Sequence, residues 1–185
     1  MKPNLVNRHF ISLRPNQVWV TDVCVLYFKQ KRLYLSVMLD LYDRKIVSYK
    51  ISEKKDADLA LYTLISARLN HYEAKNVIIH SDQGALYFSD KFQHKCRLFG
   101  FQQSMSRPGK PTDNGVIESF FSRYRAEIKC YPKPKSIEEL KNITFDWLWF
   151  YNEERINLPI KITKHKIFNY EKAIKKATEF EKSNI

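Results

Sequence analysis

The sequence has few of the residues that mark secreted, zinc-binding or membrane proteins. Its 185 residues include only 3 cysteines, which are widely spaced and form no Cys-x-x-Cys pair. This pattern argues against a disulfide framework and against a zinc site, so we expect Cys24, Cys96 and Cys130 to be small buried apolar residues. No apolar run approaches the roughly 20 residues that cross a bilayer, and no charged-then-apolar leader opens the chain. We therefore expect a soluble, cytoplasmic protein without a membrane partner.

Acidic residues are also scarce relative to basic ones. The chain has 32 Lys+Arg against 20 Asp+Glu, a formal net charge of +12 and a pI near 9.5. Lys and Arg side chains that neutralise phosphates release condensed counterions, so this excess favours a nucleic acid partner over a surface that is basic for solubility alone. Hydrophobic residues make up 44% and aromatic residues 14%, which suits one domain with a proper core.

The chain divides into an N-terminal arm, a main domain and a tail. Residues 1–16 contain two prolines, several basic side chains and little periodicity, so we expect a basic linker or arm there. The main domain is expected to cover residues 17–160. Residues 161–185 are expected to form a basic, partly helical C-terminal tail.

Patterns of apolar residues predict an α/β domain with a mixed five-stranded sheet flanked by helices. Three long β-branched and aromatic runs with brief connections predict consecutive antiparallel strands: Val18–Phe28, Leu33–Leu41 and Lys45–Ser52. Two short strands then alternate with helices: Val77–His80 and Phe101–Met105.

Four helices are expected around this sheet. Asp56 can cap a helix to Tyr72 whose buried face is expected to contain Leu61, Leu64, Ile65, Leu69 and Tyr72. A second helix starts at Ser89 or Asp90 and ends at Gly100. The Ser106–Gly115 loop leads into a third, expected to reach Cys130, with Asp113 as its cap and with Ile117, Phe120, Phe121, Tyr124 and Ile128 on its buried face. A capping box at Ser136–Glu139 begins a helix that buries Leu140, Ile143, Trp147 and Tyr151.

Three carboxylates stand out by their local frames. Asp22 interrupts an otherwise uncharged run, Asp82 follows a short apolar strand and precedes Gln83–Gly84, and Glu118 opens a helix. Carboxylates that meet at the ends of different elements supply hard oxygen ligands for Mg²⁺ or Mn²⁺. A pair of such ions activates an attacking oxygen and stabilises a leaving one in phosphoryl transfer. We therefore predict that these acids are both the catalytic and the metal-binding residues.

Each acid also has a simpler interpretation. Asp22 could face water from an edge strand, although its apolar neighbours favour a central strand, where an uncompensated carboxylate is costly. Asp82 could be an ordinary turn residue, and Glu118 a solvated first-turn glutamate stabilised by the helix dipole.

Basic residues near these acids predict contacts with nucleic acid. Steps of four, seven and eleven residues return to nearly the same side of a helix, so Ser122, Arg125 and Lys129 share a stripe with Glu118. Two of them are cations and are predicted to bind phosphates. Further DNA-binding residues are predicted in the preceding loop: Arg107, Lys110 and Asn114.

The arrangement resembles the integrase-type (DDE) catalytic core of bacterial insertion-sequence transposases of the IS-three group, which is related to retroviral integrases. The resemblance extends from about Pro15 to Arg155. It depends on seven phrases in the right order: Trp19–Asp22, Leu39–Val47, His80–Tyr87, Ser104–Gly109, Thr112–Gly115, Glu118–Phe121 and Tyr151–Arg155.

This resemblance implies a ribonuclease H-like fold and an enzyme that cuts and joins DNA. The implied reaction uses Mg²⁺ or Mn²⁺, as two ions, held by Asp22, Asp82 and Glu118. Its partners are element ends, target DNA and other copies of the chain. No protein nucleophile is required, and none of the 11 tyrosines has the basic surroundings that a tyrosine recombinase needs.

Two other functions stay open at this point. A ribonuclease H-like nuclease would use the same carboxylates. A truncated transposase that binds DNA without cutting it would fit the short N-terminus, which leaves no room for the helix-turn-helix region usual in the family. It would also fit Thr163–Lys164, where the family usually has Thr-Pro.

Other polar and aromatic residues have less specific interpretations. Asp40 and Asp43 are expected to form exposed ion pairs with Arg44. His80 is either a satisfied core histidine or a hydrogen-bond partner of a catalytic carboxylate. Trp149 lies off the buried stripe of its helix and is expected to be exposed.

Overall fold

A five-stranded sheet forms the centre of the molecule, in the order β3-β2-β1-β4-β5. The computed structural model describes residues 2–154, apart from the side chain of Pro111. The strands are β1 (Val18–Phe28), β2 (Lys31–Asp40), β3 (Ile46–Ser52), β4 (Ile78–Ser81) and β5 (Gln102–Met105). β1, β2 and β3 pair antiparallel, whereas β4 is parallel to both β1 and β5. The predicted mixed sheet is confirmed, and β1 is its central strand.

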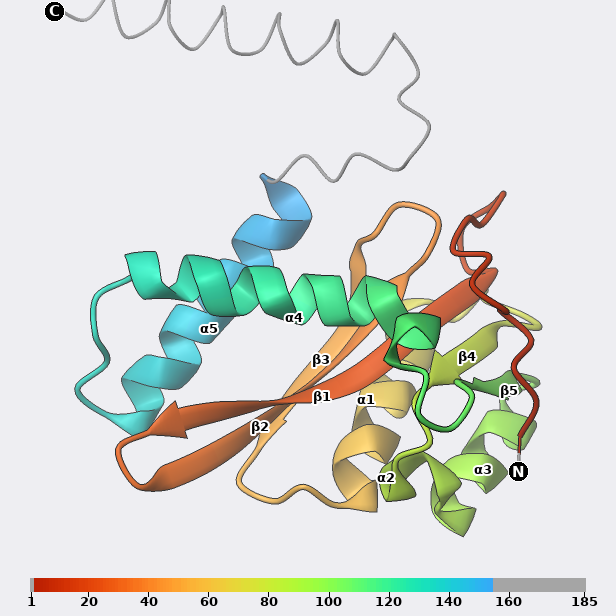
Figure 1. The fold of residues 1–185 in the computed structure, drawn as a ribbon, viewed down its shortest axis with the longest axis horizontal. Helices are drawn as coiled ribbons and strands as arrows, with labels where there is room; N and C mark the ends of the chain where they lie inside the picture. The colour runs from red at the N-terminus through yellow and green to blue at the C-terminus, as the bar shows by residue number, and fades with distance from the viewer. Residues whose placement is uncertain (1, 155–185) are drawn as a thin grey trace, which may run out of the picture. The chain divides into compact units, whose positions relative to one another are not determined.

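Helices cover both faces of this sheet (Figure 1). They are α1 (Ala57–Asn70), α2 (Ala85–Phe88), α3 (Asp90–Leu98), α4 (Gly115–Glu127) and α5 (Ile137–Glu153), with 3-10 turns η1 (Pro111–Asn114) and η2 (Ile128–Cys130). α4 and α5 lie on one face, and α1, α2 and α3 lie on the other. The short helix α2 has no counterpart in the sequence-based prediction, because four residues give too little periodicity to identify a helix.

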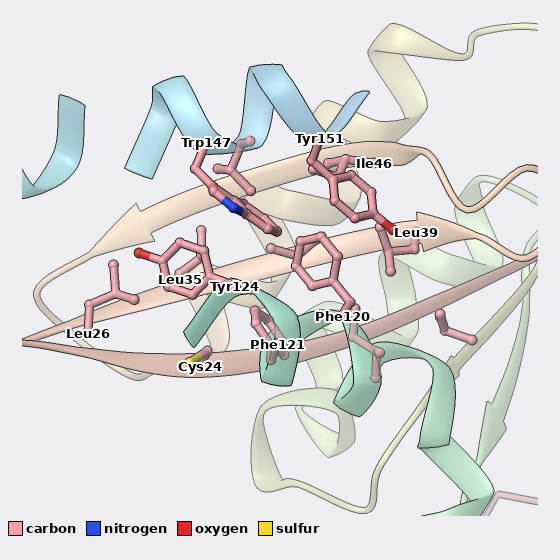
Figure 2. Close-up of a cluster of buried hydrophobic side chains, with 14 of the residues drawn as sticks. Cys24, Leu26, Leu35, Leu39, Ile46, Phe120, Phe121, Tyr124, Trp147 and Tyr151 are labelled. Atoms are coloured by element: carbon pink, nitrogen blue, oxygen red, sulfur yellow. The ribbon is translucent and has the colours of Figure 1, made fainter. Parts of the chain in front are cut away.

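Alternation along β1 sends its side chains to two separate cores. Val18, Val20, Cys24 and Leu26 join the core beneath α4 and α5, whereas Trp19 joins the core beneath α1 and α3. In the first core, Phe120 packs edge-on against Trp147 and Tyr151, with ring centroids 5.5 Å and 4.8 Å apart (Figure 2). The predicted buried faces of α4 and α5 are confirmed, except that Ile128 is only partly buried.

The buried face of α1 differs from the prediction. Asp56 caps the helix as expected, but Leu69 and Tyr72 are 72% and 76% exposed. Leu64 is buried as predicted, and the other buried residues of the helix are Leu59, Ala60, Thr63 and Ala67. Small residues let this helix lie close to the strands, so it is rotated away from the face with the larger side chains.

Two other expectations are wrong. Cys24 and Cys96 are buried as expected, but Cys130 is exposed because it lies in η2, beyond the packed part of α4. Asp40 is buried and accepts hydrogen bonds from the backbone N–H groups of Asn16 and Tyr42, at 2.6 Å and 2.9 Å, so it is not a surface ion-pair residue. Arg44 donates to the Phe10 carbonyl at 2.7 Å.

The N-terminal residues 2–16 contain no helix or strand, but they contact the core. Val6 is buried, Pro3 accepts a hydrogen bond from Met105 N at 3.0 Å, and Leu5 N donates to Ser104 Oγ at 2.9 Å. No helix within residues 2–154 is long and apolar enough to cross a membrane. The predicted tail 161–185, its boundary at 160 and the Thr163–Lys164 pair lie outside the described residues.

Candidate active site

Asp22 lies in the middle of the central strand, partly buried and on the α4 side of the sheet. Its neighbours at alternate positions, Val20 and Cys24, both belong to the core beneath α4. The Asp22 Oδ1 atom accepts a hydrogen bond of 2.7 Å from Val23 N. β1 is a central strand and not an edge strand: Asp22 pairs with Val37 of β2, and the preceding residues 18–20 pair with β4 on the other side.

Asp82 follows β4 at the level of Asp22. In the parallel pairing of β1 with β4, Val20 lies opposite His80, and continuing that register by two residues brings Asp82 level with Asp22. Asp82 is exposed, and its Oδ1 accepts a hydrogen bond of 2.9 Å from Gly84 N. A Cβ atom at position 84 would lie 2.8 Å from that oxygen, so a larger residue there would require the Asp82 side chain to move.

Glu118 lies in the first turn of α4 and is exposed. The start of this helix is anchored to β1, because Asn114 Nδ2 donates to the Thr21 carbonyl at 3.4 Å. Thr21 immediately precedes Asp22, so the anchor brings the first turn of α4 towards the carboxylate on β1. The predicted stripe of Glu118, Ser122, Arg125 and Lys129 is exposed along its length.

The negative charges of Asp82 and Glu118 both act on the Asp22 carboxylate. Burial raises the pKa of Asp22 to about 6, against the hydrogen bond from Val23 N, and the negative charges of Asp82 and Glu118 raise it further. The ammonium group of Lys55 lowers it. Sequence reasoning missed Lys55, because it lies in the β3–α1 connection and matches no motif.

Tyr87 is a second residue that sequence reasoning missed. Its side chain is fully buried beneath the acids, and its hydroxyl lies 3.5 Å from Thr21 Oγ1. Burial raises the pKa of Tyr87 well above its ordinary value, and the charges of Asp22 and Asp82 add to this effect. The only available signal was its position within the His80–Tyr87 phrase.

The donor set suits a hard divalent cation, although the side chains do not yet enclose one. Three carboxylates from three elements supply only oxygen ligands and an uncompensated negative charge. Within residues 2–154, no group of three or more His, Cys, Asp or Glu side chains is close enough to hold a metal ion as it stands. Asp82 has turned its Oδ1 towards Gly84 N, so a rotation of this exposed side chain is the smallest movement that would bring it closer.

The predicted DNA-binding residues have varied surroundings. Arg125 is exposed on α4, where its guanidinium donates to Cys24 Sγ at 3.5 Å, and Lys129 and Lys110 are also exposed. Arg107 is half-exposed and forms a two-point ion pair with Asp113. Asn114 is buried against β1, so in this conformation its side chain has no surface to offer a phosphate.

His80 is a satisfied core histidine. Its ring is fully buried, with Nδ1 2.8 Å from Ser104 Oγ and Nε2 2.8 Å from the Asp113 carbonyl. Burial lowers its pKa, so the ring is neutral at pH 7. The expectation that Asp113 caps α4 is wrong, because Asn114 is the residue at the N-cap and the Asp113 carboxylate is bound by arginines instead.

The sequence matches the integrase core domain family in two overlapping segments, residues 12–111 and 99–156. The chain belongs to this family.

Among curated proteins, it is 36% identical over 161 residues to a putative transposase for insertion sequence element IS150 of Escherichia coli. It is 32% identical over 158 residues to an uncharacterized transposase-like protein of Haemophilus influenzae. These matches cover 86% and 85% of this chain, and 56% and 73% of the two relatives. The chain thus spans little more than half the length of the IS150 relative.

Solved structures of retroviral integrases share the fold. A chain of the simian T-cell lymphotropic virus intasome matches with a TM-score of 0.67 and 21% identity, covering 89% of this chain and 55% of that chain. The HTLV-2 integrase catalytic core domain in complex with magnesium, in its trimeric form, matches with a TM-score of 0.62 and 21% identity, covering 84% of this chain and 98% of that chain. The predicted ribonuclease H-like fold is confirmed.

Proposed function

We propose that this chain is the catalytic core of a DNA transposase, which hydrolyses a phosphodiester at each element end and then joins the exposed 3′-hydroxyl to target DNA. The proposal is supported by the position of Asp22 within reach of the charges of Asp82 and Glu118, in a chain of the integrase core domain family.

Asp22, Asp82 and Glu118 are the residues that would hold Mg²⁺ or Mn²⁺, as two ions. Bound there, the ions would supply activation of the attacking oxygen and stabilisation of the leaving one. Asp22 would be the central ligand because it lies on the rigid middle strand, whereas Asp82 and Glu118 are exposed and able to adjust. The pKa of Asp22, near 6, means that this carboxylate must lose a proton before it can act as a ligand in mildly acidic solution.

Basic residues beside the carboxylates would hold the DNA backbone. Arg125 in α4 and Lys129 in the following turn η2 are both exposed and continue the predicted stripe of Glu118, so a phosphate chain that leaves the acids along this side would meet both cations. Lys55 lies in the connection between β3 and α1, and its charge acts on Asp22. It is a further candidate for a phosphate contact. These contacts do not read bases, so binding by this segment alone would be largely independent of sequence.

We place this activity in the bacterial cytoplasm, on element ends and target DNA, with more than one copy of the chain on the DNA. The relatives named as transposases are bacterial, and a retroviral intasome shares the fold. Two element ends must be joined in a concerted way, which a pair of active sites achieves by symmetry.

The deciding test is strand transfer by Glu118→Gln. The substrates are a short duplex with a pre-cleaved 3′-hydroxyl end, whose sequence is taken from inverted repeats flanking the gene, and a supercoiled plasmid in Mn²⁺. We expect wild-type protein to yield joined products and Glu118→Gln to yield none, with DNA binding nearly unchanged, because the substitution removes a metal ligand and no phosphate-binding cation.

Glu138→Gln is the matched control, since Glu138 is an exposed glutamate in the first turn of α5 just as Glu118 is in the first turn of α4. It should join DNA at the wild-type rate. Joining that persists in Glu118→Gln would refute the proposed site. Cleavage of RNA–DNA hybrids by the wild type without any joining would favour a ribonuclease H-like nuclease, and binding without either reaction would indicate an inactive remnant.

A further inference from the structure

Asp113 is a fully buried carboxylate whose two oxygens are both occupied. Oδ1 accepts hydrogen bonds from Arg8 Nε at 2.8 Å and from the Arg107 guanidinium at 2.9 Å. Oδ2 accepts from Arg107 Nε at 2.7 Å, from Asn4 Nδ2 at 2.9 Å and from Arg107 N at 3.2 Å. The carboxylate therefore fastens the N-terminal segment and the loop after β5 to one point in the chain, one residue before Asn114.

The backbone carbonyl of Asp113 is also held by a hydrogen-bond network. Ser104 Oγ accepts a hydrogen bond from Leu5 N, which leaves its hydroxyl proton to donate to His80 Nδ1. His80 then carries its own proton on Nε2 and donates it to the Asp113 carbonyl at 2.8 Å. Ser106 Oγ also lies 3.4 Å from His80 Nε2. The buried ring thus holds Asp113 at a fixed place relative to β4 and β5.

This network touches the three elements that carry the acids of the proposed site. His80 lies in β4, two residues before Asp82. Asp113 lies in η1, and Asn114, the next residue, donates to Thr21 in β1, beside Asp22. α4 begins directly after Asn114 and presents Glu118 in its first turn. The start of the helix that carries Glu118 is thereby attached to the strands that carry the other two acids.

We infer that Asp113 is a positioning residue: through Arg107, Arg8 and its own carbonyl, it fixes the start of α4 so that Glu118 faces Asp22 and Asp82. This inference depends on the proposed function, because it assigns Asp113 a role in assembling that metal site. It also reassigns Arg107, whose guanidinium is committed to Asp113, from DNA contact to support of the site.

The test measures Mn²⁺ binding in the absence of DNA, by electron paramagnetic resonance of the free ion, for wild type and Asp113→Asn. Loss of the carboxylate charge releases both arginines, so α4 can shift relative to β1. We expect Mn²⁺ affinity to fall about tenfold or more, as it does when groups that orient metal ligands are removed. Circular dichroism and thermal unfolding verify that the variant is folded at the temperature of the measurement.

Asp58→Asn is the matched control, because Asp58 is also paired with a cation, Lys91 at 3.1 Å, but this ion pair is exposed and has no link to the start of α4. Its Mn²⁺ affinity should equal that of the wild type.

If Asp113→Asn does not fold, Arg107→Lys takes its place: a lysine keeps the charge but not the two-point contact, so Mn²⁺ affinity should still fall. Wild-type Mn²⁺ affinity in Asp113→Asn, or in Arg107→Lys where it replaces that variant, would overturn the inference.

A second measurement separates this role of Arg107 from DNA binding. Arg107→Gln should weaken Mn²⁺ binding while leaving the salt dependence of DNA affinity unchanged, whereas Lys110→Gln, a loss of exposed charge in the same loop, should leave Mn²⁺ binding unchanged. Unchanged Mn²⁺ binding with a shallower salt dependence for Arg107→Gln would overturn the inference and return Arg107 to the DNA contacts. A wild-type protein that binds no Mn²⁺ would contradict the proposed function itself, whereas equal binding by wild type and variants would contradict only the role of Asp113.

Discussion

Asp22 and Asp113 are two carboxylates withdrawn from solvent whose surroundings are opposite. Asp113 is surrounded by two guanidinium groups and an amide, which hold its pKa well below its usual range. Asp22 has one hydrogen bond, from Val23 N, and two negative neighbours, and its pKa is raised to about 6. A hydrogen bond links their neighbours in the chain: Asn114, next to Asp113, donates to the carbonyl of Thr21, next to Asp22.

This contrast distinguishes a structural carboxylate from one prepared for a ligand. The charge of Asp113 is compensated within the protein, so its ionised form contributes to folding. The charge of Asp22 is not compensated, and ionising it in the folded protein is unfavourable until a cation arrives. A cation-binding site needs a carboxylate such as Asp22, and it needs structural residues such as Asp113 to hold the surrounding elements in place.

Replacing Asp22 should have the largest effect. We expect Asp22→Asn to abolish DNA joining and to abolish the rise in melting temperature that Mg²⁺ or Mn²⁺ gives the wild type. Without metal at pH 7.5, however, we expect the variant to be more stable than the wild type by roughly 1–3 kcal/mol, because the unfavourable charge is gone. Melting curves with and without metal, supported by urea unfolding, measure both effects.

Asp82→Asn provides the comparison for this result. Asp82 is exposed, so its substitution should also remove the metal-induced shift but leave the metal-free stability close to that of the wild type. An unchanged metal shift in either variant would exclude the metal site. Lower metal-free stability of Asp22→Asn would show instead that the Asp22 charge is compensated by the protein, as that of Asp113 is.

The pH dependence of stability should reveal the same contrast with a smaller effect. Because the folded pKa of Asp22 is above its unfolded value of 3.8, the folded protein holds this proton more tightly between pH 3.8 and about 6. Its contribution to stability is therefore fully present below pH 3.8 and is lost as the pH rises through about 6, with a limit of about 3 kcal/mol.

Urea unfolding of metal-free protein at closely spaced pH values between 4 and 7 measures this contribution as the difference between wild type and Asp22→Asn. The difference should grow as the pH rises and then level off above about pH 7. Saturating Mg²⁺ should reduce it, because bound cations favour the ionised carboxylate. A difference that is constant across this range would mean that the pKa of Asp22 is not raised.

The contrast between the two aspartates also shows what a sequence can reveal about a site. Asp22 was predictable because its frame is local: one charge in an uncharged run indicates a central strand and an unusual carboxylate. Asp113 was misread as a helix cap, because a turn aspartate before a helix is normally one. One of its real partners, Arg107, lies 6 residues away, but the other two, Asn4 and Arg8, lie 109 and 105 residues away in the chain, and no local pattern indicates such distant pairs.

The same limit explains the outcome for the helices. The buried faces of α4 and α5 could be predicted because each helix has a single apolar stripe, marked by aromatic residues at helical spacing. α1 offers two: one contains small residues and Leu64, the other contains Leu69 and Tyr72. Apolarity alone cannot choose between them, and close packing against the sheet selects the smaller residues.

The smallest expected effect concerns the cations on α4. Arg125 is exposed, and it contacts β1 through a weak hydrogen bond to the Cys24 thiol, so Arg125→Ala should change the free energy of unfolding by no more than about 0.5 kcal/mol. It should nevertheless lower DNA affinity and reduce the slope of log affinity against log salt by about 1, as the loss of one phosphate contact does. Lys129→Ala should do the same more weakly, being one turn further from Glu118.

Arg123→Ala is the matched control, since Arg123 is also exposed on α4 but lies about 140° around the helix from Glu118. An equal loss of DNA affinity in Arg123→Ala would mean that the net charge of α4, and not the stripe beside the acids, attracts the DNA; unfolding of Arg125→Ala would mean that Arg125, like Asp113, is structural.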